Sequence, residues 1–85
     1  MTRQTRIHAA LTAAFAPETL DVIDDSARHE GHAGAAPGGE THYNVAITAS
    51  AFSGKSRVEM QRAIMDALKS EFENGLHALS IKARA

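Results

Sequence analysis

The 85-residue chain contains no cysteine, and this absence limits its chemistry. Disulfide bonds and metal sites built only from the chain's own thiolates are excluded. A metal site in this protein must therefore use imidazole or carboxylate ligands, or thiolates that another molecule supplies.

Aromatic residues and long apolar runs are also scarce. The chain has only three phenylalanines and one tyrosine, so its core has to be built from Leu, Ile, Val, Ala and Met. No apolar run approaches the ~20 residues that span a bilayer, and the N-terminus lacks the apolar stretch of a signal peptide. We therefore expect an intracellular protein.

An excess of positive charge is missing as well. Nine basic and ten acidic side chains give a formal net charge of −1. Nucleic-acid binding that depends on neutralising many phosphates needs more Lys and Arg. With an apolar share of 44%, the chain is expected to fold as one small domain over residues 1–85.

Two segments have the periodicity of amphipathic helices. In residues 2–15, Thr2 is a suitable N-cap and Pro17 ends the helix. In residues 56–72, the sequence SRVE at the start is a capping box, and residues 74–75 stop the helix. The apolar positions of the two helices are Ile7, Leu11, Ala14, Phe15, Met60, Ile64, Met65, Leu68 and Phe72.

Three shorter segments alternate in polarity and predict strands, at residues 18–24, 41–49 and 77–84. The first two are expected to form an antiparallel hairpin, and the third, which follows a helix, to lie parallel to one of them. The order α-β-β-α-β predicts an α+β, two-layer fold in which a three-stranded mixed sheet carries both helices on one face.

The same alternation assigns the strand histidines to faces of the sheet. In the second strand, Tyr43 and its alternate neighbours point to the core, so His42 is expected to face solvent. In the third strand, His77 has the parity of Leu79 and Ile81, which places it on the apolar face. His77 is therefore either a structural histidine or a ligand held on a rigid element.

A long glycine-rich loop, residues 26–40, separates the first two strands and contains His29 and His32. Loops of this length are usually functional or disordered. The spacing H-x-x-H is only a weak metal signal without further ligands. The loop is thus either a solvated connector or a flexible arm that carries a ligand.

Enzyme motifs are not found. The segment SGKS at residues 53–56 lacks the glycine that a phosphate-binding loop needs, because that position is Ala49. Asp24 and Asp25 are adjacent, so they point to opposite sides of a strand and make a poor carboxylate pair. We therefore expect a protein without catalytic activity.

Four basic residues are weak candidates for contact with a nucleic acid or a protein partner. Lys55, Arg57 and Arg62 lie at and near the start of the second helix, and Lys82 lies on the last strand. A solvated helix face is the simpler explanation of the first three, since Arg57 and Arg62 are not spaced to share one face.

Four stretches together resemble the BolA family: VIDDSARHEGHAG, GGETHYNV, FSGKSRVEMQRAI and GLHALSIKA. The resemblance covers residues 7–83 in the family's order. It implies a class II KH-like fold, which agrees with the order of elements above. Family members usually continue into a short C-terminal helix, so this chain is expected to have a short one or none.

The resemblance also implies a function. BolA proteins pair with monothiol glutaredoxins, and the heterodimer can hold a bridging [2Fe-2S] cluster with thiolates from the glutaredoxin and glutathione. The family's constant ligand corresponds to His77, and a second ligand lies in the loop. The context of His32 favours it, and His29 stays open. The isolated chain is expected to be a monomer without cofactor. Together with glutaredoxin, it is expected to act in iron–sulfur cluster assembly, cluster transfer or iron regulation.

The alternative that the resemblance implies is a transcriptional regulator that binds duplex DNA. In either role, the protein is expected in a bacterial cytoplasm. Many members carry the sequence R-H-R near the start of the long helix. Here the corresponding residues are Met60, Gln61 and Arg62, so only the last basic residue is kept. The net charge of −1 also favours the glutaredoxin partnership over DNA binding.

Overall fold

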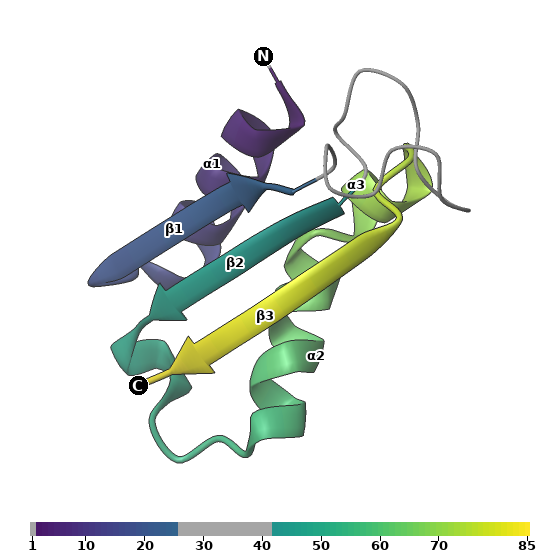
Figure 1. The fold of residues 1–85 in the computed structure, drawn as a ribbon. Helices are drawn as coiled ribbons and strands as arrows, with labels where there is room; N and C mark the ends of the chain where they lie inside the picture. The colour runs from purple at the N-terminus through teal and green to yellow at the C-terminus, as the bar shows by residue number, and fades with distance from the viewer. Residues whose placement is uncertain (1, 26–41) are drawn as a thin grey trace.

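The structure is a computed structural model that describes residues 2–25 and 42–85 (Figure 1). Its elements are α1 (Arg3–Phe15), β1 (Thr19–Asp24), β2 (His42–Thr48), the short 3-10 helix η2 (Ser50–Phe52), α2 (Arg57–Ala67), α3 (Lys69–Glu73) and β3 (Ala78–Arg84). The predicted order is confirmed. The predicted loop with His29 and His32 lies outside the described residues.

The three strands form one mixed sheet in the order β1-β2-β3. β1 runs antiparallel to β2, with Val22 opposite Val45, and β3 runs parallel to β2, with Ile81 opposite Val45. The helices lie behind the sheet on one face (Figure 1). The predicted two-layer α+β architecture is therefore confirmed.

The hydrophobic core lies between the sheet and the helices. Ile7 and Leu11 of α1 are completely buried, as are Ile64 of α2 and Leu68. The sheet contributes Val22 of β1 and, as the alternation predicted, the odd-numbered residues of β2: Tyr43, Val45 and Ile47. None of the helices in the described part of the chain is long and apolar enough to cross a membrane.

Both long helices begin at the predicted caps. The Thr2 side chain accepts a hydrogen bond from the Thr5 amide at 3.2 Å. At α2, the Glu59 amide donates to Ser56 Oγ at 3.1 Å and the Ser56 amide donates to Glu59 Oε1 at 2.8 Å. These bonds to the Ser56 backbone and side chain lower the pKa of the Glu59 carboxyl.

The second predicted helix is interrupted in the structure. Helix α2 ends at Ala67, and α3 begins at Lys69 after Leu68 departs from helical geometry. Two residues of the predicted apolar faces, Ala14 and Met65, are exposed. They lie at the margins of these faces, since neighbouring positions such as Ile64 and Met65 point about 100° apart.

Candidate functional site

His77 lies in the short connection between α3 and β3. The Leu76 amide donates to the Glu71 carbonyl at 2.9 Å, which is the longer bond of a Schellman motif at the end of α3. Gly75 has a φ of 112°, a conformation that L side chains rarely adopt. Leu76 is buried and His77 is exposed, so a fixed turn presents the imidazole to solvent.

This exposure corrects the predicted position of His77. The alternation placed His77 with Leu79 and Ile81 on the apolar face, but those two residues are half-buried while His77 is exposed. The strand begins one residue later, at Ala78. The alternation rule holds only within a strand, and His77 belongs to the preceding turn.

A part-buried ion cluster joins α3 to helix α1. Arg3 Nε donates to Glu71 Oε1 at 3.1 Å, and Arg6 Nε donates to Glu71 Oε2 at 3.0 Å. Glu71 itself is only 8% exposed. Its pKa is lowered, first by the hydrogen bond from Arg6 and also by that from Arg3, although burial opposes the shift. The ionised Glu71 carboxylate therefore holds α3 against α1.

Arg3 also contacts the turn that carries His77. Its Nη2 donates to the carbonyl of Asn74, the C-cap residue of α3. A Cβ built on Gly75 would lie 3.3 Å from the same Nη2. Positive charge at this helix end also complements the helix dipole. The turn before His77 is thus held by its own backbone and by α1.

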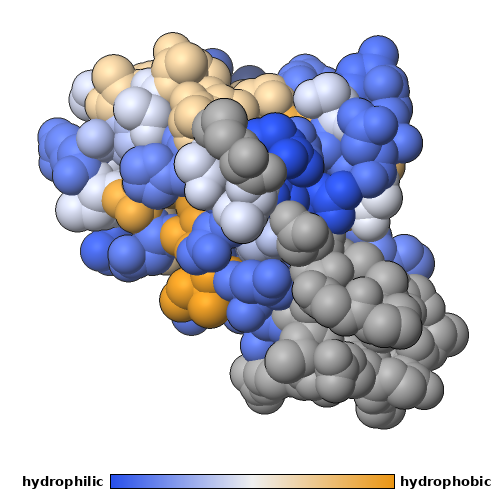
Figure 2. Space-filling model, turned by 90° about the horizontal axis from the view of Figure 1, so that it is seen from above, coloured by the Kyte–Doolittle hydropathy of each residue, from blue (hydrophilic) through white to orange (hydrophobic). Residues whose placement is uncertain are grey.

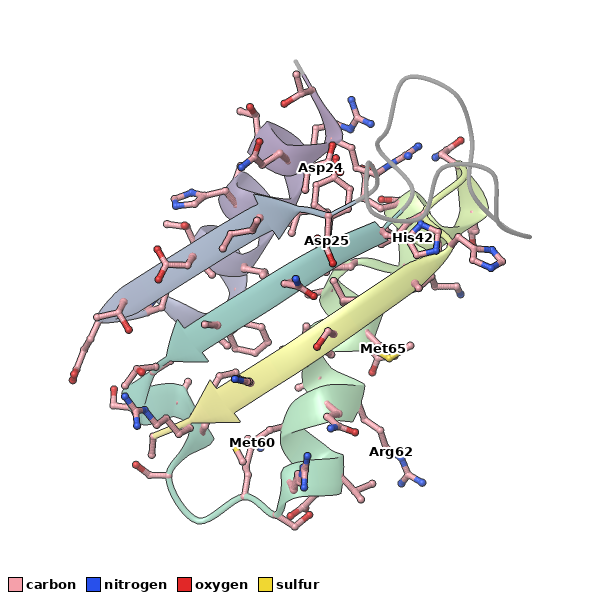
Figure 3. All side chains as sticks on the ribbon, in the orientation of Figure 1. Asp24, Asp25, His42, Met60, Arg62 and Met65 are labelled. Carbon is pink, nitrogen blue, oxygen red and sulfur yellow. The ribbon has the colours of Figure 1, made fainter. Side chains whose placement is uncertain are left out.

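His42 is the imidazole that the fold brings next to His77. The two ring centroids are 5.4 Å apart, with the rings tilted by 52°. The cause is the parallel pairing, in which His42 lies opposite Ala78, the residue that follows His77. Figure 3 shows His42 at the start of β2, beside the beginning of β3.

The predicted solvent exposure of His42 is wrong, because the residue is only 8% exposed. His42 begins the central strand, so it is flanked by the end of β1 on one side and by the turn into β3 on the other. A residue at that position is enclosed even on the face that carries no helix.

The segment that contains His29 and His32 attaches at this same end of the sheet. The Asp25 amide donates to the His42 carbonyl at 2.8 Å, so the residues on either side of segment 26–41 are joined. Figure 3 shows Asp25 and His42 close together at this end. The two residues that flank the segment, Asp25 and His42, therefore lie at the end of the sheet that presents His77, while His29 and His32 lie outside the described residues.

The surface at this end is mainly polar. Figure 2, seen from above, shows mostly hydrophilic side chains among the coloured residues, with apolar patches towards one side. Residues 2–25 and 42–85 contain no group of three or more His, Cys, Asp or Glu side chains that could hold a metal ion. The described imidazoles fit a metal group only if other ligands complete it.

Comparison with known proteins identifies the family. The family model described as BolA-like protein matches residues 11–85. The chain belongs to the BolA-like protein family. Among its relatives, the uncharacterized protein in cobS 5'region of Sinorhizobium sp is 49% identical over 80 residues, which are 93% of this chain and 86% of that protein.

Solved BolA structures share the fold. The BolA domain of SufE1 from Arabidopsis thaliana superposes with a TM-score of 0.89 at 44% identity, covering 99% of this chain and 92% of that domain. BolA1 from Mus musculus gives a TM-score of 0.77 at 33% identity, covering 96% of this chain and 63% of that one. The chain spans only 23% of the complete SufE-like protein 1 of Arabidopsis thaliana.

Membership in the BolA family narrows the range of candidate functions. The family is non-catalytic, and the similarity to BolA1 proteins and to the BolA domain of SufE1 is consistent with an iron–sulfur-related role. For a BolA protein, the end of the sheet that holds His77 and His42 is therefore the first candidate site.

The predicted basic residues do not form one group in this BolA structure. Lys55, Arg57, Arg62 and Lys82 are all exposed. Arg57 and Lys82 line a common hollow with Arg84, whereas Lys55 and Arg62 do not line it. The fold brings two of the four predicted residues to one place and adds Arg84, which the sequence analysis did not single out.

Glu71, which anchors the turn before His77, was not among the residues predicted from the sequence. Glu71 lies seven residues after Ile64 and three after Leu68, a spacing that assigns it to the buried face of the helix. An acid at such a position signals a buried partner, because an unpaired buried charge is costly. That signal could have identified Glu71, but not its partners Arg3 and Arg6.

Proposed function

We propose that this BolA protein is a partner of monothiol glutaredoxins and co-ligates a bridging [2Fe-2S] cluster in iron–sulfur cluster assembly, transfer or iron regulation. The observation that carries the proposal is the placement of His77. A fixed turn exposes its imidazole beside His42, at the end of the sheet to which segment 26–41 is attached.

The ligand chemistry supports a shared cluster. A chain without cysteine cannot supply the thiolates of an iron–sulfur site, so glutaredoxin and glutathione have to provide them. Imidazole replaces thiolate on one iron of Rieske centres, where it raises the reduction potential. In this role the protein supplies a neutral imidazole and orients it, and it has no catalytic activity.

We assign the second imidazole to His32, with His29 as the alternative. Both belong to the segment whose flanking residues, Asp25 and His42, are joined by a backbone hydrogen bond. His42 is buried against the His77 ring, and we assign it a supporting contact with the ligand instead of ligation. A buried neighbour of this kind restricts the orientations that the His77 ring can adopt.

The test is a titration of the full chain into a monothiol glutaredoxin loaded with a [2Fe-2S] cluster and glutathione, followed by visible absorption and circular dichroism. His77→Ala is expected to abolish the spectral change that wild type produces. His8→Ala is the matched control, because His8 is exposed on α1 and undergoes the same chemical change. An unchanged spectrum with His77→Ala would contradict the ligand role.

The loop ligand is resolved by the same titration with His32→Ala and His29→Ala. We expect His32→Ala to alter the spectrum and His29→Ala to leave it as in wild type. The opposite result assigns the ligand to His29. If both variants behave as wild type, the second imidazole does not come from this segment.

Binding to duplex DNA is the alternative function. Its support is the hollow shared by Arg57, Lys82 and Arg84. Three cations offer few phosphate contacts, and the chain's net charge is −1. The test is the dependence of DNA affinity on salt, where a slope near zero or no binding at moderate salt excludes this role.

A further inference from the structure

The outer edge of β3 offers backbone groups for pairing. The Ala49 amide donates to the Arg84 carbonyl at 3.0 Å, so Arg84 directs its backbone groups towards β2. Backbone groups alternate in direction along a strand, and those of Leu79, Ile81 and Ala83 therefore point away from the sheet. No hydrogen bond from elsewhere in residues 2–25 and 42–85 reaches these three residues.

The other edge of the sheet is protected. Gln4 Nε2, from α1, donates to the Val22 carbonyl of β1 at 2.6 Å. This bond occupies a carbonyl group that an added strand would need. Natural sheets block their edges in such ways to prevent unwanted pairing. The difference between the edges singles out β3 as the position for an added strand.

The helix side of the β3 edge is partly apolar. A hollow of about 570 Å³ extends along this edge, and its lining on the helix side includes Arg57, Met60 and Gln61 of α2 together with Ile81 and Ala83 of β3. Met65, one turn after Gln61, is 45% exposed. Figure 3 shows Met60 and Met65 on α2 alongside β3. An added strand would cover this apolar surface with every second side chain.

The open side of the same edge is basic. The side chains of Lys82 and Arg84 are exposed there, and both line the hollow. Arg57, at the start of α2, is the third cation of the lining, and Asp21 of β1 is its only acid among the residues that the structure describes. Side chains that point to this side of an added strand would be favoured if they were acidic.

We propose that the outer edge of β3 binds an extended segment of a partner protein in which apolar and acidic residues alternate. The segment adds a fourth strand to the sheet, with its apolar side chains against Met60, Met65 and Ile81 and its acidic side chains beside Lys82 and Arg84. This is strand addition, in which main-chain hydrogen bonds give affinity and side-chain positions give specificity.

Other occupants suit this edge less well. A nucleic acid offers no backbone that pairs with a strand edge, and an apolar floor with three cations gives little phosphate neutralisation. A second copy of the chain would bring its own Lys82 and Arg84 to the basic side. Its acidic strand β1 is already paired with β2 and blocked by Gln4.

The test uses the full chain without glutaredoxin or cluster, so its outcome is independent of the proposed function. The probe is a fluorescent peptide of four Glu-Val repeats, and its matched control has four Lys-Val repeats. We expect only the acidic peptide to raise the anisotropy. In amide NMR spectra, the largest shifts are expected at Leu79, Ile81 and Ala83.

Two variants separate pairing from charge. Ala83→Pro removes an amide that points away from the sheet, so the ladder with β2 keeps its bonds while peptide binding is lost. Lys82→Glu is expected to weaken binding about tenfold, because an opposite-charge cross-strand pair becomes a like-charge one. Lys69→Glu, on α3 and outside the lining, is the matched control and should bind as wild type.

Three outcomes would overturn the proposal. Equal binding of the Glu-Val and Lys-Val peptides excludes recognition of acidic side chains. Unchanged binding by Lys82→Glu and by a folded Ala83→Pro variant places the peptide elsewhere. If the edge binds duplex DNA and not the peptide, its occupant is a nucleic acid. If the chain instead forms dimers that Ala83→Pro abolishes, the occupant is a second copy of the chain.

Discussion

The first turn of α2 and the last turn of α3 are each stabilised by a glutamate, but the two glutamates work over different distances. Glu59 is exposed and bonds to Ser56, three residues away. Glu71 is buried and pairs with Arg6 and Arg3, which lie 65 and 68 residues away in the sequence. The first is a local device, and the second exists only in the folded chain.

This difference separates helix formation from the placement of the site. The capping box starts a helix wherever its sequence occurs, since its bonds lie within one turn. The Glu71 cluster fixes α3 relative to α1, and the turn after α3 exposes His77. Local and non-local stabilisation therefore have separate consequences, which variants of Glu71, Gly75 and Ser56 can distinguish.

Replacing the buried Glu71 is expected to lower the stability of the fold more than the other substitutions do. Glu71→Gln leaves two arginines without their anion and should lower the free energy of unfolding by about 2–3 kcal/mol. The measurement is urea unfolding. Glu73→Gln makes the same change at an exposed residue of α3 and should shift the free energy of unfolding by less than about 0.5 kcal/mol. Equal losses in the two variants would refute the role of the cluster.

Acid should weaken the same cluster. The pKa of Glu71 is lower in the folded protein than in the unfolded chain, where it has its ordinary value of about 4.5. Its contribution to stability is therefore complete above that value and disappears as the pH falls through the folded pKa. Between pH 6.5 and 2.5, the free energy of unfolding measured with urea should fall less steeply towards acid for Glu71→Gln than for wild type. Parallel pH curves would contradict the shift.

The turn before His77 should tolerate a side chain poorly. Gly75→Ala places a Cβ 3.3 Å from Arg3 Nη2 at a residue with a φ of 112°. We expect a loss of about 1–2 kcal/mol in thermal or urea unfolding. Gly54→Ala is the informative comparison, because its φ is also positive, at 77°, while no atom lies within 4 Å of the added Cβ. We expect the larger loss at Gly75, because both its more positive φ and its contact with Arg3 oppose the added Cβ, and equal losses would contradict this.

The local cap should matter least. Ser56→Ala removes the acceptor for the Glu59 amide and is expected to destabilise the protein by about 1 kcal/mol. The surroundings of His77 should stay as in wild type, which amide NMR shifts of residues 74–78 can show. Shifts there as large as those of Glu71→Gln would mean that the two helix ends are coupled.

Much of the fold could be predicted because it follows from short-range patterns. Alternation in β2 assigned Tyr43, Val45 and Ile47 to the core, and SRVE marked the start of α2. The break at Leu68 could not be predicted, since the apolar spacing continues across it. It depends on how the end of the helix packs in the complete fold.

The candidate site was predicted only in part, for a similar reason. Family resemblance identified His77, but its exposure follows from the turn at Gly75 and Leu76. His42 was assigned to solvent because alternation says nothing about what flanks the end of a strand. The contact between His42 and His77 arises from the register of β2 and β3, which sequence patterns do not specify.

The bond between the Asp25 amide and the His42 carbonyl has one further consequence. It closes the β1–β2 hairpin at a fixed point, so the sheet keeps its register whatever number of residues intervenes. Doubling the length of such a connection costs only about 0.6 kcal/mol. The β1–β2 pairing therefore sets no fixed length for the stretch that carries His29 and His32, the two proposed loop ligands.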